Sequence, residues 1–313
     1  MKHLKIVQGV RVPLPFPDDA VLSALAYEPR PGNTFIVSYP KCGTTWVQYI
    51  VYSILHDGVP FDHISQLLVE SPFLELCGAE VVNVDPRPPT IKTHLPFDKT
   101  RFSPFAKYIY IVRNPYDVCV SGYHQAKTQT LNDGGNLDIG TYVRNLWRAL
   151  GATGGTLKTA CFLGIRHRRD SNVLFLTYED LHADIENQLK RIAYFLGEEY
   201  GERISSDHGF LQRVIDMTTK ERMRPIFRDY IKANFEFMVQ QRTSRGIAVP
   251  EPTKELLDFL TCNTAKHDFV REGAVKGNKN ILLDAHKEIL REWILSKTVG
   301  SDVLKIWSAS GVM

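Results

Sequence analysis

A short segment of the chain, residues 39–46, has side chains suited to binding a phosphate-like anion. Lys41 supplies a positive charge, Gly43 permits a sharp turn, and Thr44 and Thr45 open a stretch with helical spacing of apolar residues. Amide groups at the start of a helix attract anions because the helix dipole is positive there. The segment therefore predicts a phosphate or sulfate site, although an ordinary capped helix with a surface lysine would contain the same residues. The nucleotide loop G-x-x-x-x-G-K-S/T does not occur in the sequence.

The elements that would position this segment alternate along the chain between strands and helices. Apolar runs with the length of strands buried on both faces of a parallel sheet cover residues 34–38, 108–112 and 173–176. Helical spacing follows the first run up to Leu55, and Asp180 is expected to cap a helix that runs to about Leu196. From Glu251 onward the pattern is mostly helical, with a charged, glycine-containing loop at residues 269–280. This alternation predicts an α/β fold, in which helices flank a central parallel sheet and the anion-binding segment is a P-loop-like strand-loop-helix.

Composition and charge limit the classes of protein to which the chain can belong. Of its 313 residues, 43% are hydrophobic and 23% are charged, which is typical of a globular protein and excludes a disordered or fibrous chain. The sequence contains no repeat and no long linker, so residues 1–313 are expected to form a single domain. Lys and Arg number 38 and Asp and Glu number 35, and the net charge of +3 is too small to indicate a nucleic-acid or membrane surface.

The cysteine pattern bears on metal binding and on location. The five cysteines include no C-x-x-C pair, which argues against a cysteine zinc site and against a disulfide framework. Neither H-E-x-x-H nor an EF-hand loop occurs, so no metal is expected. Reduced thiols and the lack of a signal-peptide pattern favour a cytoplasmic protein that does not cross a membrane.

Several segments resemble those of the cytosolic sulfotransferases, in the same order along the chain. Residues 39–46 (YPKCGTTW) resemble the family's 5'-phosphosulfate loop, and residues 92–96 (KTHLP) resemble its catalytic-histidine segment. Residues 113–121 (RNPYDVCVS) resemble the strand end and helix that bind a 3'-phosphate in that family. Shorter matches follow at residues 178–181, 218–223 and 269–273. The matching segments extend over most of the chain.

This resemblance implies an α/β enzyme that transfers a sulfuryl group from 3'-phosphoadenosine 5'-phosphosulfate (PAPS) to a small acceptor without a metal. It assigns His94 as the general base that takes the proton of the acceptor hydroxyl. Imidazole suits that task because it titrates near neutral pH. Lys41 would stabilise the leaving adenosine bisphosphate, Lys92 would help to bind the transferring group, and Ser121 completes the implied catalytic set.

The implied donor site has two anion-binding parts and a flat wall for adenine. Guanidinium groups match phosphate oxygens with paired hydrogen bonds, which suits Arg113 and Arg271 to the 3'-phosphate. Trp46, Tyr178 and Thr218 are implied for the adenine. The full set of donor-binding residues implied by the resemblance is Lys41, Cys42, Gly43, Thr44, Thr45, Trp46, Arg113, Ser121, Tyr178, Thr218, Met223, Phe269, Arg271, Glu272 and Gly273.

The acceptor site is implied by fewer residues. Phe16 and Phe73, together with Lys92 and His94, would contact the acceptor. Their apolar character suggests a phenolic, catecholamine-like or steroidal compound, although aromatic residues in such loops also commonly belong to the core.

Some positions depart from the family's pattern. Cys42 stands where the family has serine, Glu272 where it has a cation, and Lys220 where it has an aromatic residue. Glu272 is expected to weaken the 3'-phosphate site through repulsion between like charges. Of the family's dimer motif, K-x-x-x-T-V-x-x-x-E, Lys279 and Glu288 remain, so the sequence gives little support for a homodimer through this segment.

Two other functions stay open on the sequence. A catalytically silent adenosine bisphosphate-binding protein would be compatible with the departures at Cys42, Lys220 and Glu272. A phosphate-loop kinase would share the sheet and the anion site. It would also need the G-x-x-x-x-G-K-S/T loop and an acid that holds magnesium, and the sequence shows neither feature.

Overall fold

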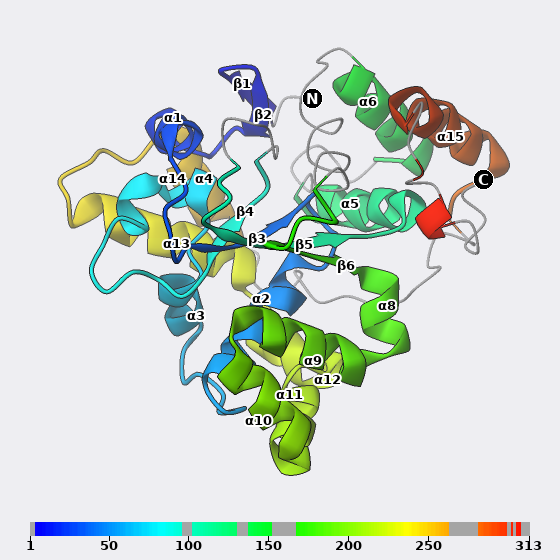
Figure 1. The fold of residues 1–313 in the computed structure, drawn as a ribbon. Helices are drawn as coiled ribbons and strands as arrows, with labels where there is room; N and C mark the ends of the chain where they lie inside the picture. Colours follow the sequence, from blue (N-terminus) through cyan, green and yellow to red (C-terminus); the bar gives the residue numbers. More distant parts are fainter. Residues whose placement is uncertain are drawn as a thin grey trace.

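Four parallel strands form the central sheet of the computed structural model, which describes residues 4–95, 102–129, 137–151, 167–262, 281–298, 302 and 305–307 (Figure 1). In spatial order, the strands are β4 (Ile91–Thr93), β3 (Thr34–Ser38), β5 (Lys107–Val112) and β6 (Val173–Thr177). The predicted α/β fold with a central parallel sheet is confirmed, and so are the strands expected from the apolar runs. The sequence pattern does not show β4, because this strand has only three residues and includes Lys92 and Thr93.

Alternate side chains of the strands pack into two apolar layers, one on each face of the sheet. Ile36 and Ile109 lie in one buried cluster, whereas Phe35 and Tyr108 lie in the other. Strand side chains alternate between faces, so a sheet with apolar residues in both sets must be covered on both sides. This is the physical reason for helices above and below the sheet.

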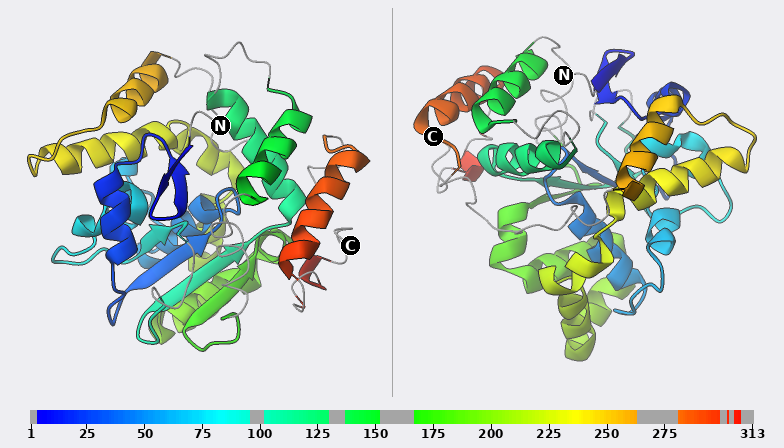
Figure 2. Two further views of the ribbon diagram at one scale, coloured as in Figure 1. Left: turned by 90° about the horizontal axis from the view of Figure 1, so that it is seen from above. Right: turned by 180° about the vertical axis from the view of Figure 1, so that it is seen from behind.

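The helices fall into groups on opposite faces of the sheet. The group below the sheet in Figure 1 consists of α2 (Thr44–Leu55), α8 (Tyr178–Ala183), α9 (Ile185–Leu196), α10 (Glu198–Ser206) and α11 (His208–Met217). Helix α12 (Lys220–Ile226) follows α11, and its buried Met223 packs in the other cluster. The other face is covered over β5 by α5 (Pro115–Gln129), α6 (Ile139–Gly151) and α15 (Asp284–Thr298). Figure 2 shows from two further sides how α15 lies against α6. Within the described ranges, no helix combines the length and the apolar character needed to span a bilayer.

Helices α8 and α9 replace the single helix expected between Asp180 and Leu196. The backbone amide of Asp180 donates to Oγ1 of Thr177 at 2.9 Å, so Thr177 rather than Asp180 caps α8. The chain then breaks at Asp184, whose side chain accepts a hydrogen bond from the amide of Asn187 and caps α9. The expectation of one helix capped by Asp180 was therefore wrong, because a second capping residue restarts the helix. The expected loop at residues 269–280 lies outside the described residues.

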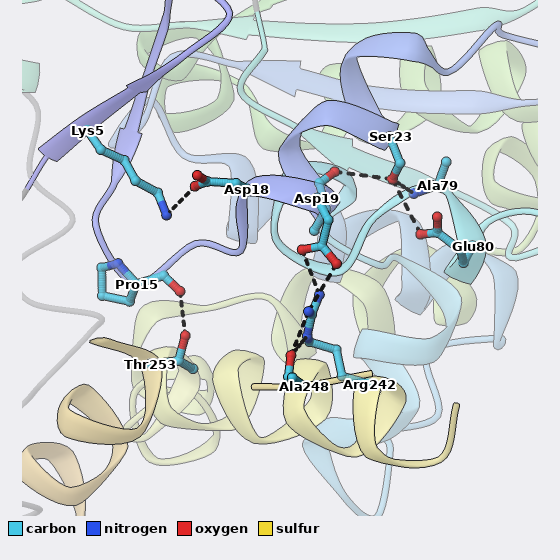
Figure 3. A network of polar contacts seen from close by, with 11 residues as sticks. Lys5, Pro15, Asp18, Asp19, Ser23, Ala79, Glu80, Arg242, Ala248 and Thr253 are labelled. Atoms are coloured by element: carbon cyan, nitrogen blue, oxygen red, sulfur yellow. Dashed lines mark hydrogen bonds and ion pairs between the residues drawn. The ribbon is translucent and has the colours of Figure 1, made fainter. Parts of the chain in front are cut away.

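The β4 side of the sheet carries the remaining elements. They are β1 (Leu4–Val7), β2 (Val10–Pro13), α1 (Asp18–Ala26), α3 (Ile64–Glu70), α4 (Leu74–Cys77), the 3-10 turn η1 (Ala79–Val81), α13 (Tyr230–Thr243) and α14 (Glu251–Cys262). Arg242 donates to both carboxylate oxygens of Asp19 at 3.0 Å, and Ser23 accepts a hydrogen bond from the amide of Ala79 at 2.9 Å (Figure 3). These contacts join α1 to α13 and to η1, which directly follows α4.

Candidate active site

The carboxyl ends of the parallel strands meet at one edge of the sheet. The register pairs Val37 with Thr93 and Val112 with Thr177, so the strand ends lie side by side. Loops at this edge of a doubly wound sheet are the usual place for ligands. The residues that directly follow β3, β4, β5 and β6 are Tyr39, His94, Arg113 and Tyr178.

The loop between β3 and α2 has the backbone geometry of an anion site. Lys41 and Gly43 have φ angles of 73° and 101°, and these positive angles turn the chain sharply before the first helical residue, Thr44. Gly43 is the N-cap of α2, and because it has no side chain it makes no capping bond to the amides of the first turn. Such amides attract an anion, because they lack partners within the helix. The expected strand-loop-helix is present, and its binding of an anion stays a prediction.

Gly43 also lies against Tyr178, the residue that follows β6. A Cβ atom at Gly43 would lie 2.7 Å from Cδ2 of Tyr178, closer than such contacts are found. Glycine therefore meets two requirements here, the positive φ angle and the close approach of an aromatic ring. The contact places the start of α2 directly against Tyr178.

Ser38, the last residue of β3, joins this loop to the candidate base. Its Oγ lies 2.5 Å from Oγ1 of Thr44, and its carbonyl oxygen accepts a hydrogen bond from Nδ1 of His94 at 2.8 Å. Ser38 is completely buried, with 0% of its surface exposed. The start of α2 and the imidazole are thus held by the same residue.

The imidazole of His94 is held as a neutral base. A carbonyl oxygen can only accept a hydrogen bond, so the bond to Ser38 places the proton on Nδ1 and leaves the lone pair on Nε2. Burial, together with the positive charges of Lys92 and Lys41, lowers the pKa of His94 to about 3. The ring is therefore neutral at physiological pH, as a proton acceptor must be.

Lys92 is buried near the imidazole, with its ammonium group beside aromatic rings. The residue is 5% exposed, Nζ lies 4.2 Å from the centre of the Phe73 ring, and Nζ donates to the hydroxyl of Tyr230 at 3.4 Å. Tyr230 in turn donates to Oε1 of Gln48 at 2.9 Å. The charge of Lys92 is close enough to lower the pKa of His94, while its contact with a transferring group stays a prediction.

An aromatic cluster borders the imidazole. The ring of Phe73 lies 5.1 Å from that of His94 in an edge-to-face arrangement, and Phe16 lies 5.5 Å from Phe73. A parallel bridge between Phe73 and Lys92 extends the sheet beyond β4 and places the Phe73 ring there. The structure thus brings Phe73 against the candidate base and Phe16 against Phe73. Phe16 is also part of the apolar core, since it is only 6% exposed.

Arg113, Tyr178 and Trp46 form a second part of the site. The guanidinium carbon of Arg113 lies 4.0 Å from the centre of the Tyr178 ring, and Nη1 donates to the carbonyl oxygen of Lys41 at 3.3 Å. The ring of Trp46 lies 5.5 Å from that of Tyr178, edge to face. Nε1 of Trp46 is buried and has no hydrogen-bond partner among the described residues. A ligand that accepts a hydrogen bond would satisfy this group.

Other predicted site residues are buried or half-buried. Oγ1 of Thr218 donates to a backbone carbonyl of α11 at 2.8 Å, and Met223 is buried in the core. Ser121 is half-buried on α5, and no hydrogen bond within the described ranges connects it with Arg113. Cys42 is also buried. The remaining predicted residues, Phe269, Arg271, Glu272 and Gly273, lie outside the described residues.

Acidic residues that the sequence analysis did not single out support the site. Glu75, on α4, accepts hydrogen bonds from the amide of His94 and from the hydroxyl of Thr93. Glu179, in the first turn of α8, accepts a hydrogen bond from the amide of Asn114 at 2.9 Å. An acid inside the apolar stretch at residues 73–77 was the available sequence signal for Glu75. The described segments contain no cluster of three or more His, Cys, Asp or Glu residues that could hold a metal ion.

Comparisons with known sequences identify relatives of this chain. Residues 31–302 match the sequence model of the sulfotransferase domain. The chain is 35% identical to mouse sulfotransferase 2B1 over 201 residues, which cover 61% of this chain and 57% of that protein. It is 32% identical to mouse sulfotransferase 4A1 over 219 residues, which cover 66% of this chain and 72% of that protein. The match to the first of these relatives thus spans just over half of its length.

Solved structures share the fold. The structure of mouse sulfotransferase SULT7A1 complexed with PAP aligns with a TM-score of 0.67 at 22% identity, over 99% of this chain and 100% of that one. Retinol dehydratase in complex with androsterone and inactive cofactor PAP aligns with a TM-score of 0.64 at 19% identity, over 93% and 88% of the two chains. Since the sulfotransferase domain accounts for residues 31–302, this chain belongs to the sulfotransferase family.

Proposed function

We propose that this protein transfers a sulfuryl group from PAPS to a hydroxyl or amine group of a small acceptor, with His94 as the general base. The observation that carries this proposal is the link through Ser38, which connects the anion loop to a neutral imidazole. An anion site and a proton acceptor held by one residue are what a group transfer from an anionic donor requires. A single domain over residues 1–313 and a cytoplasmic location stay predictions, and so does a possible homodimer, for which the family's dimer motif gives little support.

The residues of the site fit such a donor. Lys41 and the first-turn amides of α2 suit the 5'-phosphosulfate, and the missing Cβ of Gly43 leaves the loop free to pack against Tyr178. Arg113 suits the 3'-phosphate, and Trp46 offers, beside Tyr178, a ring and an N–H that has no partner in the described part of the chain. When bound, PAPS supplies an activated sulfuryl group whose leaving group is the adenosine bisphosphate (PAP).

The chain's own residues then have separate tasks. His94 accepts the proton of the acceptor hydroxyl at Nε2, and the bond from Nδ1 to Ser38 keeps the ring in this tautomer. Lys41 and the loop amides stabilise the negative charge that develops on the leaving group. A sulfuryl group carries less charge than a terminal phosphoryl group, so a lysine and backbone amides can provide stabilisation that kinases obtain from magnesium.

The aromatic cluster indicates the class of acceptor. Phe16 and Phe73 place apolar rings next to His94, which favours a planar or hydrophobic acceptor such as a phenol, a catecholamine-like amine or a steroid. One structural relative, retinol dehydratase, forms a complex with the steroid androsterone. We therefore include a steroid alcohol in the test.

The test is a transfer assay with sulfur-labelled PAPS and a panel of phenols, catecholamines and steroid alcohols. We expect labelled product from at least one acceptor and much slower labelling, by about 10²–10⁴-fold, with His94→Ala. A silent bisphosphate-binding protein would bind PAP in calorimetry but label no acceptor. A kinase would instead transfer phosphate from labelled ATP with magnesium.

Replacing Gly43 with alanine is expected to weaken PAP binding and to lower the free energy of unfolding. A residue with a Cβ atom in the left-handed region costs about 1–2 kcal/mol. The overlap with Tyr178 adds to this cost and must shift the loop, since the Cβ would lie 2.7 Å from the ring. Calorimetry with PAP and urea unfolding measure the two effects.

Gly9→Ala is the matched control for this substitution. Gly9 has a φ angle of 77°, and nothing lies within 4 Å of its Cβ position, so the control carries the backbone strain without the overlap. If both variants lost the same stability and both bound PAP like the wild type, the role given to Gly43 would be refuted.

A further inference from the structure

Glu75 is a buried acid that connects α4 to the end of β4. It is 3% exposed. Its Oε1 accepts a hydrogen bond from the backbone amide of His94 at 2.6 Å, and its Oε2 accepts one from Oγ1 of Thr93 at 2.9 Å. Oγ1 of Thr93 also accepts a hydrogen bond from the amide of Leu95 at 3.0 Å. The carboxylate therefore binds the backbone turn that carries the candidate base.

The helix that carries Glu75 is itself held by several contacts. Phe73, its N-cap, forms the parallel bridge with Lys92, so the start of α4 is attached to the edge of the sheet. Its other end continues into η1, where the amide of Ala79 donates to Ser23 of α1 (Figure 3). Helix α1 packs on α4 and is joined to α13 by the Asp19–Arg242 pair. A carboxylate on such a support can hold a neighbouring turn in one position.

We propose that Glu75 is a positioning residue for His94. The carboxylate holds the backbone amide of His94, the carbonyl oxygen of Ser38 holds Nδ1, and the two contacts together fix the direction in which Nε2 points. The role in catalysis rests on the proposed function, in which His94 is the base. The role of Glu75 in fixing the imidazole ring does not depend on the proposed function.

The carboxylate is kept here at a cost in stability. Burial raises the pKa of Glu75 to about 7. The hydrogen bonds to the carboxylate and the charge of Lys92 lower the pKa, but their effect is smaller than that of burial. The pKa of Glu75 is thus higher in the folded protein than in the unfolded chain. Its contribution to the free energy of unfolding is therefore complete below the unfolded pKa, and it is lost as the pH rises through about 7. Besides Glu75, the charged and titratable groups on α4 and on the elements packed against it are Asp18, Asp19, Cys77, Glu80, Lys92, Tyr230, Lys232, Glu236, Arg242 and, one residue after β4, His94. A buried carboxylate with such a cost is expected at a functional position.

The substitution Glu75→Gln tests the proposal, because the amide keeps the shape, removes the charge and has one acceptor oxygen in place of two. It therefore cannot accept hydrogen bonds from both the His94 amide and the Thr93 hydroxyl, as the carboxylate does. We expect kcat to fall by about 10²-fold, as for a small displacement of a reacting group, while PAP binds with wild-type affinity. Above pH 7 the urea midpoint of the variant is expected to equal or exceed that of the wild type, because the buried charge is gone. A residue with a structural role alone would lower the stability instead.

Further variants guard against a failure to fold. Thr93→Val removes the hydroxyl that links the carboxylate to the turn and should lower kcat by a smaller factor. The double variant Glu75→Gln/Thr93→Val should lose less than the product of the single losses, because both changes break one network. Glu80→Gln is the matched control, since Glu80 is an exposed acid on the adjoining η1. Its Oε2 accepts a hydrogen bond from Ser23 at 3.3 Å, which the amide oxygen of glutamine can also accept, so this variant should behave like the wild type.

Nitrogen-15 NMR of labelled histidine tests the geometry without donor or acceptor. The signal of His94, identified by its loss in His94→Ala, should show the proton on Nδ1 in the wild type and a mixture of tautomers in Glu75→Gln. Wild-type kcat and an unchanged tautomer in Glu75→Gln would overturn the proposal, as would parallel losses of PAP affinity and stability. A changed tautomer in a protein that transfers nothing from PAPS would instead refute the proposed function and leave the positioning role standing.

Discussion

Replacing His94 with alanine is expected to lower kcat for sulfuryl transfer by about 10²–10⁴-fold, the usual contribution of a positioned general base. PAP affinity should stay nearly unchanged, because no donor-binding role is assigned to the imidazole. The ring is oriented for this task, since Nδ1 donates to the carbonyl oxygen of Ser38 and Nε2 carries the lone pair. Transfer rates with labelled PAPS and calorimetry with PAP provide the two measurements.

His56→Ala is the matched control for this experiment. His56 follows α2 directly and bonds to Glu70 at 2.7 Å, so it is another partly buried, hydrogen-bonded histidine outside the proposed site. We expect near wild-type turnover from this control. Full turnover in His94→Ala would refute the base assignment, and an equal loss of PAP affinity would assign His94 a structural role instead.

The low pKa of His94 adds a pH dependence to this prediction. With a pKa of about 3, caused first by burial and then by Lys92 and Lys41, the imidazole of the free enzyme is already neutral well below physiological pH. An acid limb of kcat/KM near neutral pH would therefore belong to another group. Anions bound against the lysines would offset their charge and raise the pKa of His94, which makes the base stronger once the donor is present.

Arg113→Ala is expected to remove most of the preference for PAP over adenosine 5'-phosphate. A charge-assisted contact to a phosphate contributes about 1.5–3 kcal/mol, which corresponds to about 10–150-fold in affinity. The guanidinium is already oriented, because it stacks 4.0 Å from the Tyr178 ring and donates to the carbonyl oxygen of Lys41. Calorimetry of both nucleotides with wild type and variant measures the difference.

The control for Arg113 is Arg203→Ala, which removes an arginine of α10 that pairs with Asp57. This variant should keep the preference for the bisphosphate. Equal affinities of the wild type for the two nucleotides would show that no 3'-phosphate site exists. If Arg113→Ala lowered the affinity for both nucleotides by the same factor, Arg113 would act on a part of the donor site other than the 3'-phosphate.

Local patterns in the sequence determined the layers of the fold and the candidate loop. The apolar runs that became β3, β5 and β6 are continuous because the sheet is buried on both faces, and this property is visible residue by residue. Lys41 and Gly43, which form the turn before α2, are two residues apart in the sequence. The strand-loop-helix was therefore predictable from the sequence as well. Segments that match the family's motifs, such as residues 39–46, also identified the family.

The tertiary structure decided how the base is held, because those contacts join residues far apart in the chain. The amide of His94 and the carboxylate of Glu75 are 19 residues apart, and they meet only because α4 bridges to the edge of β4. The tautomer of His94 depends on the carbonyl oxygen of Ser38, 56 residues away, which lies within reach only in the register of β3 with β4. Neither contact leaves a periodic pattern in the sequence, since each depends on a single polar atom placed by packing.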